Sequence, residues 1–294
     1  AERLLYDGAG SDDLTLTGDD TVTGDDGVVF LAADGIPESA IAATGAGAAA
    51  LNFAFATSGV TVNLPSQQSA GSVIQGGGIG DQLAGTVSGF RDIFGSAFAD
   101  LLIGEGLIED GAGADSIQLS GSAVLRLSPD NIRESAITGV GIGPGLDLGL
   151  ATSAATVDLS VQGQTATTAL LGGGFGNQGG GEVEGIRDVF GGAENPFGVD
   201  VTGDGFDNLL VGSAGSDTLS GQGGDDVIEG LAGQDLLTGG LGADSFVFAD
   251  ANATNGGNRD VISDFSSSDG DEIDLPASIA GGPARCSSGT ALSD

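Results

Sequence analysis

The sequence predicts an all-β protein, an elongated right-handed parallel β-roll or β-solenoid, and three observations lead to this fold class. A nine-residue repeat of glycine, acidic and apolar positions runs through residues 203–247. A longer repeat relates residues 34–96 to residues 130–192, at an offset of about 96 positions. Residues 51–64 and 146–159 alternate apolar and polar side chains with a period of two, which is typical of strands with one buried face. Self-similarity at fixed periods indicates stacked coils.

The composition excludes several classes of function. The chain has 42 acidic and 7 basic residues, a formal net charge of −35 and no histidine. The absence of histidine excludes histidine-dependent triads and His-ligated zinc. All the basic residues are arginine, so a lysine Schiff base is excluded as well. A charge of this sign repels nucleic acid and anionic membrane surfaces and attracts cations. No apolar run approaches the roughly 18 residues of a membrane span, so we expect no membrane insertion.

The array of residues 203–247 divides into five nonapeptides in one register: GDGFDNLLV, GSAGSDTLS, GQGGDDVIE, GLAGQDLLT and GGLGADSFV. Glycine occupies the first position of each. The eighth position is apolar, at Leu210, Leu219, Ile228, Leu237 and Phe246. The sixth position carries Asn208, Asp217, Asp226, Asp235 and Asp244.

Each nonapeptide is expected to form a Gly-rich loop followed by a short strand that points its eighth residue inward, so two nonapeptides make one turn of a coil. The sixth-position carboxylates would then line up along the outside of the stack. Aspartate is common in turns, but turn chemistry does not demand a nine-residue period. A column of carboxylates repels itself without a cation, and hard oxygen ligands suit calcium.

This pattern resembles the repeats-in-toxin (RTX) nonapeptide array of bacterial proteins exported by type I secretion. The resemblance implies that each calcium ion lies between loop n and loop n+2, so Asn208 would pair with Asp226, Asp226 with Asp244, and Asp217 with Asp235. It also implies carbonyl ligands from Gly212, Ala214, Gly221, Gly223, Gly230 and Gly239. Asn208 departs from the family pattern, as does Phe206, which stands where the fourth-position glycine belongs. Residues 242–275 resemble the strand, Asp-rich turn and strand that cap such arrays.

The remainder of the chain is interpreted as degenerate or spacer coils. The expected segments are N-terminal degenerate turns (1–33), a first duplicated unit (34–128), a second duplicated unit (129–202), the array (203–247) and a cap with a tail that falls where the family keeps its secretion signal (248–294). Stretches similar to the nonapeptide add Asp12, Asp100 and Asp115 as candidate metal ligands. The aspartates at positions 260, 264, 269 and 271 could form a further metal site, although a capped turn is favoured.

Within the duplicated units, the alternating segments are predicted to be strand pairs joined by a short Thr-Ser turn. Leu51, Phe53 and Phe55 should point inward, as should Leu146, Leu148 and Leu150. The Gly-rich segments 76–82 and 172–178 are interpreted as tight coil corners rather than nucleotide loops. For the Arg-Asp pairs at 91–92 and 187–188, contacts to a neighbouring coil are favoured over the binding of an acidic sugar.

From these features we expect a calcium-binding β-roll, secreted to the extracellular space or cell surface, that folds on export into a calcium-rich exterior. The duplicated units favour part of an extracellular or cell-surface structural protein, such as an adhesin or surface-layer component. The alternative is a C-terminal folding and export module of a larger type I secreted enzyme or toxin. No catalytic site and no enzyme activity is expected within these residues. Calcium ions are the expected partners, and self-assembly or a cell-surface or glycan ligand is left open.

Overall fold

The structure, a computed structural model, contains β-strands and short 3-10 turns such as η2 (Leu159–Val161). It describes residues 4–6, 13–16, 28–31, 33, 35, 40–43, 49–65, 72–79, 82–83, 87–164, 168–179, 183–248 and 259–275. The chain divides into two compact units, which we call the first unit (Ala1–Pro144) and the second unit (Gly145–Asp294). The second duplicated segment expected from the sequence, residues 129–202, is therefore shared between the two units.

The first unit is built from coils whose strands alternate between two main sheets. Along one face the strands pair in parallel in the order β1 (Leu4–Tyr6), β3 (Val28–Phe30), β5 (Ala49–Asn52), β10 (Phe90–Phe94), β12 (Leu107–Glu109) and β14 (Val124–Arg126). The second face has the order β15 (Ala136–Val140), β13 (Ser116–Ser120), β11 (Leu101–Gly104), β6 (Val60–Asn63), β7 (Ser72–Gly76) and β8 (Gln82–Leu83). A small parallel sheet contains β2 (Asp13–Leu16), β4 (Ala40–Ala43) and β9 (Val87–Ser88).

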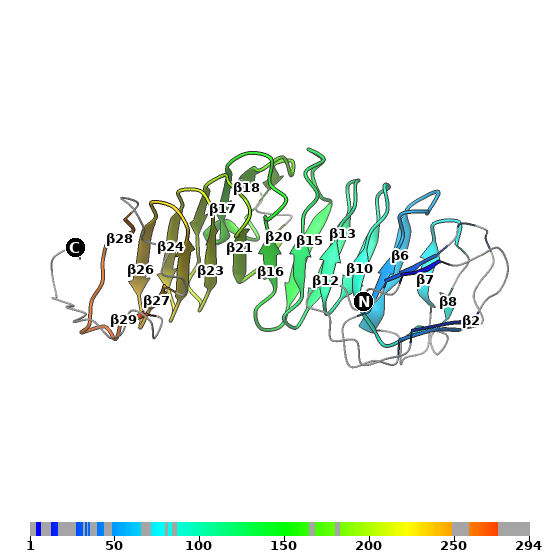
Figure 1. Cartoon of the computed structure of the whole chain (residues 1–294), viewed down its shortest axis with the longest axis horizontal. Helices are drawn as coiled ribbons and strands as arrows, with labels where there is room; N and C mark the ends of the chain where they lie inside the picture. Colours follow the sequence, from blue (N-terminus) through cyan, green and yellow to red (C-terminus); the bar gives the residue numbers. More distant parts are fainter. Residues whose placement is uncertain are drawn as a thin grey trace. The chain divides into compact units, whose positions relative to one another are not determined.

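The second unit repeats this arrangement, and Figure 1 shows its strands stacked as successive rungs. One face runs through β16 (Gly145–Asp147), β21 (Asp188–Gly192), β23 (Leu209–Ser213), β25 (Val227–Leu231), β27 (Ser245–Val247) and β29 (Glu272–Asp274), all parallel. The other face runs through β19 (Gln178–Gly179), β18 (Thr168–Gly172), β17 (Ala155–Asp158), β22 (Val199–Thr202), β24 (Thr218–Gly223), β26 (Leu236–Leu241) and β28 (Val261–Ile262). The short strand β20 is Val183–Glu184.

The register of the array places every second nonapeptide in the same sheet. Leu210 of β23 is opposite Ile228 of β25, which is opposite Phe246 of β27. On the other face Leu219 of β24 is opposite Leu237 of β26. All five eighth-position side chains are 0% exposed, which confirms that this position points into the core. Two nine-residue units per turn therefore give a coil of 18 residues, and the fold is the predicted parallel β-roll.

The duplicated segments contain antiparallel arms that the sequence did not predict. β7 is antiparallel to both β6 and β8, and β18 is antiparallel to both β17 and β19. The Gly-rich segment at 76–78, predicted as a coil corner, instead begins at the last residue of β7 and forms a turn of three glycines with φ between 66° and 80°. Its equivalent at 172–174 has φ between 67° and 87°. Glycine is needed because other residues rarely adopt three consecutive left-handed conformations.

The predicted strand pairs are also wrong in detail, because consecutive strands lie in different sheets. β5 pairs with β3 and β10, whereas β6 pairs with β7 and β11, so the Thr-Ser turn between them is a corner. The corner is closed by the amide of Thr57, which donates to the carbonyl of Gly77 at 2.8 Å. Since the strand ends before the corner, Phe55 and Leu150 are 52% and 45% exposed, against the prediction, while Phe53 and Leu148 are buried.

The segment after the array forms one further coil. β28 pairs with β26 and β29 pairs with β27, so the predicted strand, turn and strand are present as continuations of the two sheets. Phe265 lies near Phe246, with ring centroids 6.4 Å apart. Val261 is 46% exposed, so the apolar residues of this coil cover the end of the core only in part.

The register allows a matched test of the core. Ile228 is 0% exposed and its neighbour Val227 is 37% exposed on the same strand. Ile228→Ala should lower the free energy of unfolding, measured by denaturant titration in calcium, by about 2–5 kcal/mol because it leaves a cavity in a one-residue-wide layer. Val227→Ala should cost well under half of that loss. Equal losses would contradict the assignment of the inward face.

Candidate calcium-binding columns

The sixth-position side chains of the array are stacked along the two edges where loops meet. The backbone amide of Asn208 donates to Asp226 Oδ1 at 2.8 Å, and that of Asp226 donates to Asp244 Oδ1 at 3.0 Å. On the other edge the amide of Asp217 donates to Asp235 Oδ1 at 2.9 Å. These are the pairs, two loops apart, that the resemblance implied. We call the set beginning with Asn208 column A and the set beginning with Asp217 column B.

The columns are buried, whereas the sequence predicted that they would line the outside. The four aspartates of the array are 1–2% exposed. The reason is that each carboxylate turns under its own glycine-rich loop to accept the amide of an adjacent coil. An aspartate in a solvated turn would not need to bury its carboxylate or to accept an amide from another coil.

One oxygen of most of these carboxylates has no hydrogen-bond partner. Oδ2 is buried and unpartnered at Asp226, Asp235 and Asp244. Asp217, at the start of column B, differs because its Oδ2 accepts the amide of Ser213 at 2.7 Å and its Oδ1 accepts that of Val199 at 2.7 Å. A buried, unpaired carboxylate oxygen is costly, so these positions fit a cation with oxygen ligands.

The first-position glycines make room for this arrangement. A Cβ atom on Gly221 would overlap Asp226 Oδ2 and would lie 2.7 Å from the carbonyl oxygen of Gly239. A Cβ on Gly212 would meet Asp217 Oδ2 and the carbonyl oxygen of Gly230. Carboxylate and carbonyl oxygens from loops two apart therefore converge on the same glycine, and such oxygens are the ligands that calcium prefers.

Of the other carbonyl ligands implied by the resemblance, Ala214 and Gly223 lie in the same loops. Their amides donate to the preceding coil, to the carbonyls of Asn195 and Asp204 at 2.8 and 3.1 Å. Their ligand roles, like those of the carboxylates, stay predictions.

The coil after the array extends both columns, which the sequence did not predict. The amide of Asp235 donates to Asp260 Oδ1 at 3.1 Å, and that of Asp244 donates to Asp271 Oδ1 at 3.2 Å. Asp260 Oδ2 is also buried without a partner, whereas Asp271 Oδ2 accepts the amide of Ser266 at 2.7 Å, as in a capped turn. The spacings are 25 and 27 residues, whereas sixth positions two loops apart in the array are 18 residues apart, so the repeat did not point to these pairs.

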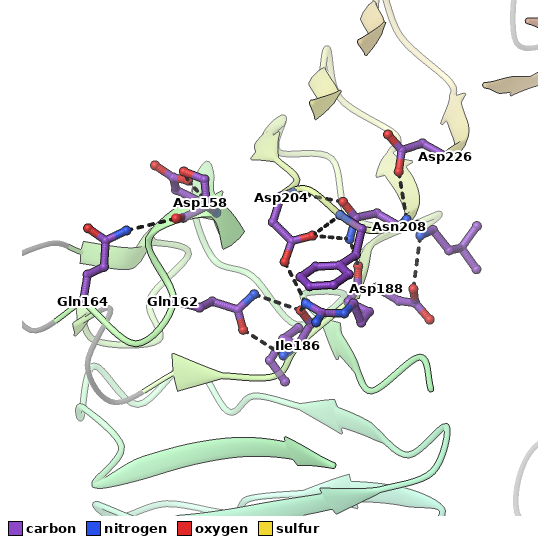
Figure 2. A network of polar contacts seen from close by, with 12 residues as sticks. Asp158, Gln162, Gln164, Ile186, Asp188, Asp204, Asn208 and Asp226 are labelled. Carbon is purple, nitrogen blue, oxygen red and sulfur yellow. Dashed lines mark hydrogen bonds and ion pairs between the residues drawn. The ribbon is translucent and has the colours of Figure 1, made fainter. Parts of the chain in front are cut away.

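At the start of column A a protein cation is present (Figure 2). Asn208 donates from Nδ2 to the carbonyl of Arg187 at 2.9 Å, and its Oδ1 accepts the amide of Asp204 at 3.0 Å. Arg187 forms an ion pair with Asp204 at 2.7 Å, and its guanidinium carbon lies 4.0 Å from the ring centroid of Phe206. The two departures from the family pattern, Asn208 and Phe206, thus surround an arginine whose positive charge compensates this loop.

The Arg-Asp pairs contact neighbouring coils, as favoured from the sequence. Asp92 Oδ1 accepts the amide of Leu107 at 2.8 Å, and Asp188 Oδ1 accepts that of Leu209 at 3.1 Å.

The first unit contains a related column. Asp100 Oδ1 accepts the amide of Val60 at 2.8 Å and its Oδ2 accepts that of Ser96 at 2.7 Å, so both oxygens are satisfied. The amide of Asp100 donates to Asp115 Oδ1 at 2.7 Å, and Asp115 Oδ2 has no partner. Asp12 lies outside the described residues. Sequence reasoning missed Asp110 and Glu134, which lie beside Asp115.

Burial sets the electrostatics of the columns. Desolvation raises the pKa of Asp226 and of Asp235 to about 7, and the neighbouring carboxylates Asp244 and Asp217 add to the shift. Amides donating to the carboxylates oppose the shift in part. Desolvation also raises the pKa of Asp217, Asp244 and Asp260.

The comparison with protein families agrees with this geometry. Residues 202–237 and 211–246 match the family model described as the RTX calcium-binding nonapeptide repeat. The chain carries RTX repeats. RTX repeats bind Ca²⁺, so calcium is the cofactor of this array. No curated protein matches the chain. Within the described residues, no helix has the length and apolar character needed to cross a membrane.

The carboxylate and carbonyl oxygens that converge on a first-position glycine, such as Asp226 Oδ2 and the Gly239 carbonyl at Gly221, form what we call a glycine cradle, and the cradle can be tested with a matched control. Gly221→Ala should raise the calcium concentration at the folding midpoint about tenfold, equivalent to about 1.4 kcal/mol, because the methyl group displaces Asp226 and the Gly239 carbonyl. The control is Gly205→Ala: Gly205 lies two loops earlier, a Cβ there would meet nothing within 4 Å, and the midpoint should stay unchanged. Calcium titrations followed by circular dichroism measure both. Similar shifts would contradict the cradle.

The raised pKa values predict how pH acts in the absence of metal. Because the pKa of Asp226 and Asp235 rises from 3.8 in the unfolded chain to about 7 in the fold, the fold binds protons more tightly. Their contribution to stability is therefore fully present below the unfolded pKa and is lost as the pH rises through the folded pKa. In chelator, β-sheet circular dichroism should be stronger near pH 5 than near pH 8.

Removing the charge of the buried aspartates tests this pH effect, and removing the charge of an exposed glutamate is the control. Replacing Asp226 and Asp235 by asparagine should shrink the difference between the two pH values. Glu184→Gln removes an exposed charge and should not change it. A β-sheet signal that grows with pH in chelator would show that the buried carboxylates do not control the metal-free fold.

Proposed function

We propose that this chain is a secreted protein that folds when it meets calcium outside the cell and forms part of an extracellular or cell-surface structural protein. The observation that carries the proposal is the set of buried carboxylate oxygens without partners in columns A and B. In low calcium, these groups oppose folding, since burial favours their neutral forms while the unfolded chain leaves them charged in water.

The residues that would hold calcium are those of the columns and the glycine cradles. A bound calcium ion would supply positive charge between two loops that lie one coil apart. The chain's own contribution is the positioning: amides of one coil hold Oδ1 of the next, and the first-position glycines keep Oδ2 and a carbonyl oxygen close together. Extracellular calcium modules bind with dissociation constants of about 10⁻⁴–10⁻³ M, which suits a switch between cytosol and exterior.

The net charge of −35 acts in the same direction. Self-repulsion destabilises a compact chain, so an acidic protein of this kind would stay extended and suited to export until cations bind. Each site at 100 times its dissociation constant adds about 2.7 kcal/mol to the stability of the fold, and several sites together suffice to decide whether it folds.

The duplicated coils favour the structural part of the proposal. The first and second units each contain a corner, an antiparallel arm and a return to parallel coils. Stacked units of this kind extend a scaffold by repetition. We also propose that the chain itself has no catalytic site, in keeping with the lack of histidine and lysine.

Calcium titration followed by far-ultraviolet circular dichroism and light scattering tests the proposal. A cooperative gain of β-sheet signal at submillimolar to millimolar calcium, absent with magnesium, is the expected result. Light scattering that rises with folding would support a self-assembling structural protein. Folding without a rise in scattering would favour the folding and export module of a larger secreted protein. A chain that is already folded in chelator and ignores calcium would overturn the proposal.

A further inference from the structure

Outside the matched repeats, three carboxylates of the first unit converge in its interior. Asp110, Asp115 and Glu134 each offer one oxygen, and these oxygens all lie within 4.8 Å of one another. The three residues are 2%, 0% and 3% exposed. Asp110 follows β12, Asp115 precedes β13 and Glu134 precedes β15, so the cluster joins two adjacent coils.

Hydrogen bonds to backbone amides fix each member of this cluster in place. Asp110 Oδ1 accepts the amide of Ser128 at 2.8 Å, and Glu134 Oε2 accepts the amide of Asp115 at 2.6 Å. Asp115 Oδ1 accepts the amide of Asp100. These bonds orient the carboxylates and leave the cluster with a formal charge of −3 when all are ionised.

A second observation points to a ligand at this place. Asp115 is 0% exposed, and its Oδ2 is buried without a hydrogen-bond partner. The same unpaired oxygen occurs at Asp226, Asp235 and Asp244, which lie within the residues that match the calcium-binding repeat. The cluster differs from the array because two carboxylates come from one loop and the third is a glutamate.

We propose that Asp110, Asp115 and Glu134 form a separate calcium site that stabilises the first unit independently of the array. Ligand oxygens on one calcium ion are at most about 4.6–5.2 Å apart, twice the Ca–O distance of 2.3–2.6 Å, whereas those on magnesium are at most about 4.2 Å apart. The three oxygens all lie within 4.8 Å of one another, which is close enough for one calcium ion to bind them together. This site goes beyond the proposed function, which rests on residues 203–247.

The sequence contains the parts of this site twice. The motif Asp-Gly-Ala-Gly-x-Asp occurs at 7–12 and 110–115, and Asp-x-Ile-x-Glu-Ser-Ala-Ile occurs at 34–41 and 130–137. The strands that follow also pair in equivalent register: Asp13 is opposite Ala40 in β2 and β4, and Ser116 is opposite Ala136 in β13 and β15. The second motif belongs to the duplicated segments, and the first motif recurs with it outside them, so the parts of the site recur as a set.

Hydrogen exchange of the full chain, measured segment by segment across a calcium titration, tests the proposal. In the wild type, residues 107–140 should gain protection with calcium and not with magnesium. Glu134→Gln keeps an acceptor for the Asp115 amide but removes a charge, and it should raise the calcium midpoint of this segment about tenfold. The array at 203–247 should keep its own midpoint.

Glu105→Gln provides the matched control, because Glu105 is an exposed carboxylate of the same unit and its loss should change neither midpoint. Asp110→Asn, which keeps an acceptor for Ser128, should repeat the effect of Glu134→Gln. If neither cluster variant gains protection at any calcium concentration, the number of calcium ions bound per chain is measured instead. At least one ion fewer in the cluster variants than in Glu105→Gln supports the site. An equal number overturns it.

Two further outcomes would also overturn the site: full protection of residues 107–140 in chelator, or equal midpoints in Glu134→Gln and Glu105→Gln. Failure of the proposed function is separate, since it would appear as a lack of calcium-dependent protection in residues 203–247.

Discussion

The structure depends on carboxylates that are buried between stacked loops and held by backbone amides of the adjacent coil. Each such bond ties two loops together, but at Asp226, Asp235 and Asp244 it also removes a charged group from water and leaves the second oxygen without a partner. The fold is therefore incomplete as a set of protein groups alone. Cation binding would complete it, and would link stability to the calcium concentration around the chain.

The thin core explains why cation binding would have a large effect on stability. Each nonapeptide contributes one fully buried side chain at its eighth position, for example Leu219 or Ile228, and glycines occupy much of the loop. Burial of one such side chain stabilises by about 1.5–3 kcal/mol, which is comparable to the entropy cost of ordering one or two residues. A coil of 18 residues gains little from the core alone, so the interactions between loops decide whether it forms.

The chain compensates loop charge in two different ways. At the start of column A, Asn208 replaces an aspartate and Arg187 lies between Asp204 and the ring of Phe206, so positive charge comes from the protein. Around Asp115 the acidic residues are instead concentrated, with Asp110 and Glu134 close by. In the first arrangement a protein cation offsets the negative charge, whereas the second gathers negative charge that favours a metal ion.

The sequence by itself determined the β-roll and the inward eighth position, and its resemblance to the RTX array implied the pairing of sixth positions two loops apart. A strict period of nine leaves only one register in which glycine, carboxylate and apolar side chains all repeat. Only the tertiary structure shows the contacts between residues whose spacing does not follow the repeat. Asp115 meets Glu134 across 19 residues and Asp235 meets Asp260 across 25, so no period marks them. It also decided that the carboxylates are buried and that the duplicated segments form antiparallel arms, because both depend on which coil supplies the hydrogen-bond partner rather than on local pattern.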